Sequence, residues 1–176
     1  MTTCRTYFRI SIFQTRYSSH WRPEELELKV GDRAPDFTLK GTPDVDYSLS
    51  SYIGEPVVLV FYPEDHTPVC TAQLRSYSTS LSEFTDLGAK VLAISPQGIE
   101  SHEAFAFKNQ IGFPLLCDED KSVAEQFGVL GPLGFYRRSV FVLDRDGFIC
   151  YAKVTRAGLT FQPTEELLEA VTKLQR

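Results

Sequence analysis

The chain alternates between runs of apolar residues and stretches in which apolar positions recur every three or four residues. Val57–Tyr62 (VVLVFY) is apolar throughout and rich in β-branched residues, which is typical of a strand buried on both faces of a sheet. Residues 68–87 place leucine and aromatic side chains three or four positions apart, which predicts a helix that Gly88 ends. Strands and helices are therefore expected to alternate, as they do in α/β domains.

The same criteria predict the remaining elements. Further strands are expected at 36–39, 47–49, 91–94, 115–117, 139–143 and 148–154. Further helices are expected at 50–53 (a single turn), 100–110, 122–127 and 163–174. The first two strands would pair across the turn at 41–46, and the last two across Asp144–Gly147. This order predicts a central mixed β-sheet flanked by helices, and it resembles the thioredoxin-like fold with an N-terminal β-hairpin extension.

Length and composition describe an ordinary globular domain. The 176 residues, 43% of them hydrophobic, are enough for one domain with a sizeable core. No apolar run approaches the roughly 18–20 residues that cross a bilayer, so we expect no membrane span. The net charge of −5 argues against a nucleic-acid partner, because such binding depends on neutralising phosphates.

The positive charge is concentrated at the N-terminus. Residues 1–22 contain four arginines (Arg5, Arg9, Arg16 and Arg22) and no acidic residue. The other 14 basic residues oppose all 23 acidic ones, so residues 23–176 carry a net charge of 14 − 23 = −9. We therefore expect an Arg/Ser/Thr-rich extension at 1–29 and one domain at 30–176. The extension has the composition of a chloroplast or mitochondrial transit peptide, and the alternative is a plain basic extension on a cytoplasmic protein.

The four cysteines are too few for a disulfide scaffold and are not arranged as a metal site. Cys4, Cys70, Cys117 and Cys150 include no C-x-x-C pair, and the three histidines are scattered, so we expect no structural zinc. Cys117 and Cys150 lie within predicted apolar strands, where cysteine is usually a small buried residue.

Cys70 lies in a different setting, just after a predicted strand. Pro63 cannot donate to a central ladder, so the chain leaves the sheet there. Thr67 is a good N-cap and Pro68 suits the first helical position, which places Cys70 in the first turn of a helix. Free backbone N–H groups and the helix dipole favour a thiolate at that position. Cys70 is therefore a candidate nucleophile.

Pro63-x-x-x-Thr67-x-x-Cys70 resembles the P-x-x-x-T-x-x-C signature of the peroxiredoxins. The resemblance extends over about 145 residues, from Val30 to Leu174. Other matching segments are Gly31–Phe37 (GDRAPDF), Val91–Pro96, Ser101–His102, Phe113–Leu116 and Arg138–Phe141 (RSVF). The spacing is most similar to the bacterioferritin-comigratory-protein branch, or to a neighbouring single-cysteine type.

This resemblance implies a mechanism. Cys70 would be the peroxidatic cysteine, which attacks hydrogen peroxide or an organic hydroperoxide and becomes a sulfenic acid. Thr67 would orient the peroxide, Pro63 would shield the thiolate, and Arg138 would support the thiolate and polarise the peroxide. No metal, haem, flavin or nucleotide cofactor is implied. The partner would be a thioredoxin- or glutaredoxin-like reductant.

The chain departs from the branch at several positions. A resolving cysteine often follows the peroxidatic one by five residues, and Arg75 stands there. We therefore expect a one-cysteine cycle with an external thiol, and the alternative is an intramolecular disulfide to Cys117. Val69 stands where glycine is common, and Gln73 where glutamate is usual.

Several polar residues lie near Cys70 in the sequence or in the matching segments. Glu64 and Asp65 would disfavour a thiolate at Cys70 unless they point outward. His66 is expected to be a solvated loop residue rather than a general base, and His102 a structural or surface residue.

Two other functions remain as alternatives on the same fold. A thiol–disulfide oxidoreductase needs a second cysteine three residues before the nucleophile, where Thr67 stands. A redox-responsive chaperone or binding protein has no support in the motif. The protein is expected to be a monomer or a homodimer, with Tyr77 or Phe135 in either the core or an interface.

Overall fold

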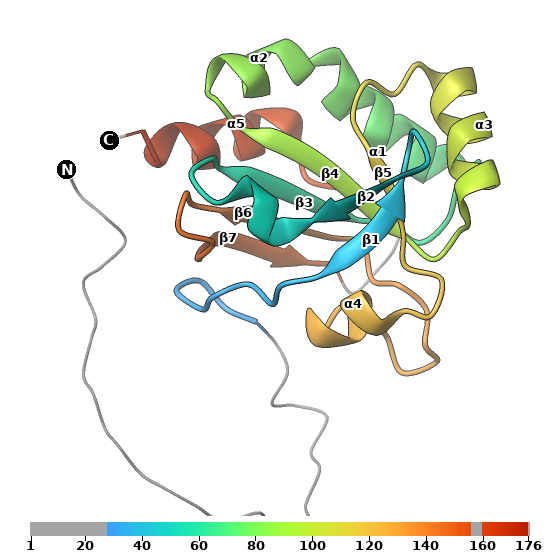
Figure 1. Ribbon diagram of the computed structural model, residues 1–176. Coiled ribbons are helices and arrows are strands. Elements are labelled where there is room, and N and C mark those ends of the chain that lie inside the picture. Colours follow the sequence, from blue (N-terminus) through green and yellow to red (C-terminus); the bar gives the residue numbers. More distant parts are fainter. Residues whose placement is uncertain (1–27, 156–159, 176) are drawn as a thin grey trace, which may run out of the picture.

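The computed structural model describes residues 28–155 and 160–175, which form one mixed sheet with helices on both faces (Figure 1). The strands are β1 (Thr38–Gly41), β2 (Val45–Ser48), β3 (Val57–Phe61), β4 (Lys90–Ser95), β5 (Leu115–Cys117), β6 (Ser139–Leu143) and β7 (Ile149–Val154). The helices are the 3₁₀ turn η1 (Leu49–Tyr52), α1 (Pro68–Thr79), α2 (Leu81–Asp86), α3 (Ile99–Asn109), α4 (Ser122–Gln126) and α5 (Thr164–Lys173).

The seven strands lie in the order β2-β1-β5-β4-β3-β6-β7. The central strands β3, β4 and β5 are parallel, and β6 runs antiparallel to β3 with Ser139 opposite Phe61. The outer strands β7 on one side and β1–β2 on the other are antiparallel to their neighbours. The predicted mixed sheet, the N-terminal hairpin and the helices that flank the sheet are therefore confirmed.

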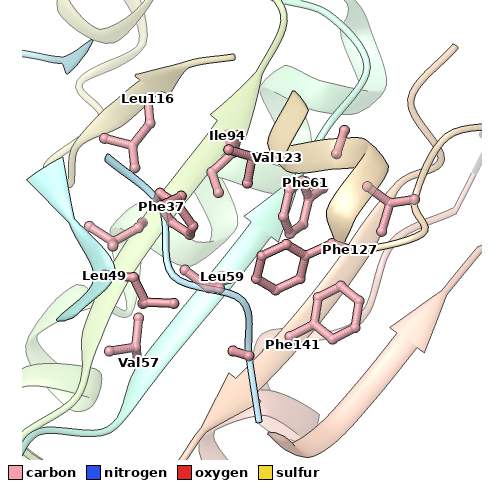
Figure 2. Close-up of a cluster of buried hydrophobic side chains, with 14 of the residues drawn as sticks. Phe37, Leu49, Val57, Leu59, Phe61, Ile94, Leu116, Val123, Phe127 and Phe141 are labelled. Atoms are coloured by element: carbon pink, nitrogen blue, oxygen red, sulfur yellow. The ribbon is translucent and has the colours of Figure 1, made fainter. Parts of the chain in front are cut away.

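Strand β3 is buried on both faces, as its continuous apolar sequence predicts. Leu59 and Phe61 belong to the cluster on the face that α4 covers, whereas Val58 and Val60 belong to the opposite cluster. Figure 2 shows Phe127 beside Phe61 and Phe141, with ring centroids 5.0 and 5.4 Å apart respectively. These aromatic contacts hold the short helix α4 against the sheet.

Helices α1, α2, α3 and α5 cover the other face (Figure 1). Each contributes fully buried side chains, among them Tyr77 from α1, Phe84 from α2, Phe105 from α3 and Leu167 from α5. Tyr77 is thus a core residue, whereas Phe135, in the loop between α4 and β6, is 70% exposed. This second core also contains Cys70.

The single helix expected at 68–87 is wrong, because the chain breaks at Ser80 into α1 and α2. Ser80 ends α1 with φ −95° and ψ 17° and begins α2, while Leu81 and Phe84 still pack against the same cluster. The apolar periodicity therefore continues across the break and does not reveal it. The first hairpin has a shorter turn than expected, because β1 and β2 extend to Gly41 and from Val45.

The predicted transit peptide at residues 1–22 falls outside the described residues, and so does most of the extension assigned to 1–29. Within the described parts of the chain, no helix is both long enough and apolar enough to cross a membrane.

Candidate active site

The topology brings two segments that are distant in the sequence together at the end of the sheet where β3 ends and β6 begins. The chain leaves β3 after Tyr62, whose backbone N–H still donates to the Ile94 carbonyl, and Pro63 follows. Because β6 is antiparallel to β3, the start of β6 lies beside the end of β3, and Arg138 immediately precedes β6. Cys70 and Arg138 therefore meet although 68 positions separate them in the sequence.

Cys70 is in the first turn of α1, as the sequence predicts, and only 1% of its surface is exposed. The Nη2 atom of Arg138 donates to the Cys70 sulfur at 3.3 Å, and the arginine itself is 2% exposed. A guanidinium that is shielded from water stabilises a nearby anion more strongly than one in solvent. The guanidinium is therefore positioned to stabilise a negative charge on the sulfur.

Arg138 is held in this orientation by a chain of side chains along α1. Its Nη1 donates to Gln73 Oε1, Gln73 Nε2 lies 3.4 Å from the Tyr77 hydroxyl, and Tyr77 donates to the Gln162 carbonyl at 2.7 Å. Burial raises the pKa of Tyr77 to about 12, so its phenol stays protonated and able to donate. Gln73 therefore accepts from Arg138 through Oε1 and donates to Tyr77 through Nε2, and this fixes the direction of its amide.

Gln73 is neutral, so it orients the guanidinium without neutralising its positive charge. Among the described residues, no carboxylate forms a salt bridge with Arg138. Arg138 Nε is buried and has no hydrogen-bond partner in the part of the chain that the structure describes. The cation beside Cys70 therefore keeps an unused donor.

Thr67 occupies the N-cap position of α1, but the expected side-chain cap is wrong. Its hydroxyl instead donates to the Glu64 carbonyl at 3.3 Å, while its own carbonyl accepts from the Thr71 N–H at 2.9 Å. Pro63 and Thr67 are both half-buried in the loop that leads to Cys70. The three residues of the sequence motif thus lie on one short segment that follows the end of β3.

Asp65 points inward and is 4% exposed, so neither an outward orientation nor an unpaired charge describes it. It accepts hydrogen bonds from the Tyr62 hydroxyl at 2.8 Å, Ser101 Oγ at 2.7 Å and His102 Nδ1 at 2.8 Å. Burial acts to raise the pKa of Asp65, but its interactions with His102, Ser101 and Tyr62 together outweigh burial and lower the pKa overall.

His102 is fully buried, which is the structural rather than the surface alternative. The spacing between residues 65 and 102 does not predict that they are in contact. The sequence pointed to His102 only because Ser101–His102 is one of the segments that match the family. His66 is an exposed loop residue, as expected, and its ring lies 5.1 Å from that of Phe105.

The other two described cysteines lie in strands, as predicted. Cys117 ends β5, is buried, and has its pKa raised to about 11, chiefly by burial. In the sheet, β4 and β3 lie between β5 and β6, so two strands separate Cys117 from the strand that follows Arg138. Cys150 is half-buried in β7, and its sulfur lies 3.8 Å from Asp144 Oδ2.

Arg75 takes the place of the usual nearby resolving cysteine, and its side chain is exposed on α1. Among residues 28–155 and 160–175, no three His, Cys, Asp or Glu side chains gather as a metal site.

Comparisons with known proteins agree with this geometry. The model of the AhpC/TSA family matches residues 30–152. The chloroplastic peroxiredoxin Q of Sedum lineare is 38% identical over 162 residues, which is 90% of this chain and 85% of that protein. Peroxidoxin BcpB of Mycobacterium tuberculosis superposes with a TM-score of 0.73 at 30% identity, covering 85% of this chain and 97% of that structure.

The bacterioferritin comigratory protein of Xanthomonas campestris superposes with a TM-score of 0.75 at 26% identity, and the match covers 85% of this chain and 98% of that structure. The family match spans well over half of the chain, and the relatives are named as peroxiredoxins. The chain therefore belongs to the AhpC/TSA family and is a peroxidase, a peroxiredoxin of the bacterioferritin-comigratory-protein type.

Proposed function

We propose that Cys70 is the residue that reduces the peroxide. Its thiolate attacks the terminal oxygen of a hydroperoxide, an S–O bond forms, and the O–O bond breaks. The leaving oxygen takes up a proton and departs as water or an alcohol, so that the peroxide gains two electrons and Cys70 becomes a sulfenic acid. The observation that carries this proposal is the 3.3 Å contact between Arg138 Nη2 and the Cys70 sulfur inside a water-poor site.

Arg138 serves the reaction before and during oxygen transfer. Its charge stabilises the thiolate, and the unused Nε–H is a donor for a peroxide oxygen, onto which negative charge moves as the O–O bond breaks. Because Gln73 Oε1 and the sulfur hold the two terminal nitrogens, the arginine needs no rearrangement when the peroxide arrives. In this proposal Thr67 accepts a hydrogen bond from the peroxide, and Pro63 shields the thiolate.

We propose a one-cysteine cycle for the return to the thiol. Two observations support it: Arg75 stands at the usual resolving position, and burial keeps the Cys117 thiol protonated at neutral pH, with its pKa at about 11. A protonated thiol is a poor nucleophile toward a sulfenic acid. An external thiol condenses with the sulfenic acid to a mixed disulfide and water, and a second thiol equivalent releases reduced Cys70.

The proposed substrates are hydrogen peroxide and organic hydroperoxides, and the proposed reductant is a thioredoxin or a glutaredoxin. The Xanthomonas campestris relative is described by its alkyl peroxide reduction activity, which supports the organic substrates. Turnover with cumene hydroperoxide, supported in turn by a thioredoxin system and by a glutathione–glutaredoxin system, distinguishes the two reductants. Turnover with neither system would contradict this part of the proposal.

Replacement of Cys70 tests the proposed function. Cys70→Ser should abolish peroxide consumption, whereas Cys150→Ser, which removes a cysteine from the outer strand β7, should retain it. Cys117→Ser separates the two cycles, because a one-cysteine cycle survives it and an intramolecular disulfide cycle does not. Peroxide consumption by Cys70→Ser at the wild-type rate would refute the role of Cys70.

The proposed compartment is the cytoplasm, and import into a chloroplast or mitochondrion is the alternative that residues 1–22 raise. The Sedum lineare relative is named as chloroplastic, which supports the alternative. A fusion of residues 1–29 to a fluorescent protein decides between them by its location in plant cells.

For assembly, sedimentation of wild type and Phe135→Ser tests whether exposed Phe135 joins two copies in a homodimer or the protein is a monomer.

A further inference from the structure

Asp65 and His102 take no part in the chemistry proposed above, yet they lie next to it. Tyr62 packs in the same apolar cluster as Cys70 and donates to the Asp65 carboxylate at 2.8 Å. One side chain therefore connects the carboxylate with the surroundings of the sulfur. A negative charge near a site with little water disfavours a thiolate there unless another charge compensates it.

Both ring nitrogens of His102 face hydrogen-bond acceptors. Nδ1 lies 2.8 Å from Asp65 Oδ2, and Nε2 lies 3.2 Å from the Leu116 carbonyl oxygen. The Ser95 hydroxyl lies 3.5 Å from Nε2 but donates its hydrogen to Gln97 Oε1 at 2.7 Å, so it offers His102 only lone pairs. A neutral imidazole has one N–H, and only the imidazolium satisfies both sides of the ring.

Two titratable neighbours of the pair, Tyr62 and Cys117, are uncharged at neutral pH. Burial raises the pKa of Tyr62, on the β3 side, well above its usual value, and the pKa of Cys117, at the end of β5, to about 11. Ser101, from α3, contributes a hydroxyl that donates to Asp65 at 2.7 Å. Of the groups that contact Asp65, His102 is therefore the one that can carry a compensating positive charge.

We propose that His102 is a buried imidazolium that neutralises Asp65 and thereby keeps the Cys70 thiolate available at neutral pH. His102 is then a positioning residue that acts on Cys70 through Asp65 and Tyr62. The inference deepens the proposed function and rests on Cys70 being the reacting thiolate.

The first test compares His102→Gln with the double variant His102→Gln/Asp65→Asn. The pH profile of Cys70 alkylation by iodoacetamide, followed by mass spectrometry of its peptide, should move about one pH unit upward in the single variant. A shift of one pH unit corresponds to about 1.4 kcal/mol of unfavourable interaction between the uncompensated carboxylate and the thiolate. The double variant should return the profile to the wild-type position, and the control His66→Gln should not move it.

A role in packing alone gives a different result. It predicts that the double variant is no better than His102→Gln and that neither variant moves the profile, and this outcome would overturn the inference. The second test uses the wild-type protein and so does not depend on whether a variant folds. Long-range ¹H–¹⁵N NMR spectra at pH 7 should show both His102 ring nitrogens protonated, and a neutral tautomer would also overturn it. Neither measurement uses peroxide, so both can fail while the test of the Cys70 role succeeds.

Discussion

Replacement of Arg138 by methionine removes the cation next to Cys70 and leaves a side chain of similar length. The structure predicts the size of the effect. One hydrogen bond from a charged donor reaches the sulfur at 3.3 Å, and such bonds contribute about 1.5–3 kcal/mol. At 1.36 kcal/mol for each factor of ten, the second-order rate constant for Cys70 oxidation should fall roughly 10- to 150-fold.

The fold should survive this replacement. Arg138→Met leaves the buried Gln73 Oε1 without its donor, which costs about 1–3 kcal/mol of the free energy of unfolding. Domains of this kind have about 5–15 kcal/mol, so urea denaturation should still show a cooperative transition at a lower midpoint. The kinetic loss can therefore be measured on folded protein.

The assay is stopped-flow oxidation of the reduced protein by hydrogen peroxide at pH 7. Arg137→Met is the matched control, because Arg137 is the neighbouring half-buried arginine and donates no hydrogen bond to the sulfur. Its rate constant should be within about threefold of wild type. The rate constant of Arg138→Lys should lie between those of wild type and Arg138→Met, since lysine keeps the positive charge but lacks the planar set of N–H donors of a guanidinium. A folded Arg138→Met protein that reacts as fast as the Arg137→Met control would refute the reasoning.

Three further predictions concern stability and thiol reactivity. Because the pKa of Asp65 is lower in the folded protein than in the unfolded chain, the ionised Asp65 stabilises the fold above the unfolded pKa of about 3.9. This contribution to the free energy of unfolding is lost as the pH falls through the lower folded pKa. Urea denaturation from pH 7 to 2 should therefore show that the free energy of unfolding falls less steeply with acid in Asp65→Asn than in wild type. Cys117, with its pKa at about 11, should react with iodoacetamide at pH 7.5 far more slowly than Cys70, and unfolding in urea should remove the difference, which peptide mass spectrometry detects. Phe127→Ala should lower the free energy of unfolding by about 3–5 kcal/mol, because the ring is 1% exposed; a loss below 1 kcal/mol in urea denaturation would contradict this packing.

The sequence predicts elements well where burial leaves a continuous trace. Val57–Phe61 is recognisable because a strand covered on both faces has apolar residues at every position. The break at Ser80 leaves no such trace, since Tyr77 before it and Leu81 and Phe84 after it all face the same core. The end of β1 at Gly41 lies where that strand pairs with Leu116 of β5, a contact that local sequence does not encode.

The candidate site also combines residues that the sequence predicts with residues that only the fold brings together. Pro63, Thr67 and Cys70 are neighbours in the chain, so their spacing predicts the thiol at a helix start. Arg138 joins them only because β6 runs antiparallel to β3, and the sequence suggested it through the family resemblance. The pair of Asp65 with His102 depends on how α3 packs against the loop after β3, which no spacing reveals.

The central claim is that peroxide oxidises Cys70 to a sulfenic acid that waits for an external thiol. Peptide mapping of wild-type protein after one equivalent of hydrogen peroxide, with dimedone present to trap sulfenic acid, tests it most directly. We expect a dimedone adduct on the Cys70 peptide and none on the Cys117 and Cys150 peptides. A Cys70–Cys117 disulfide in place of the adduct would contradict the one-cysteine cycle, and an unmodified Cys70 peptide would contradict the claim itself.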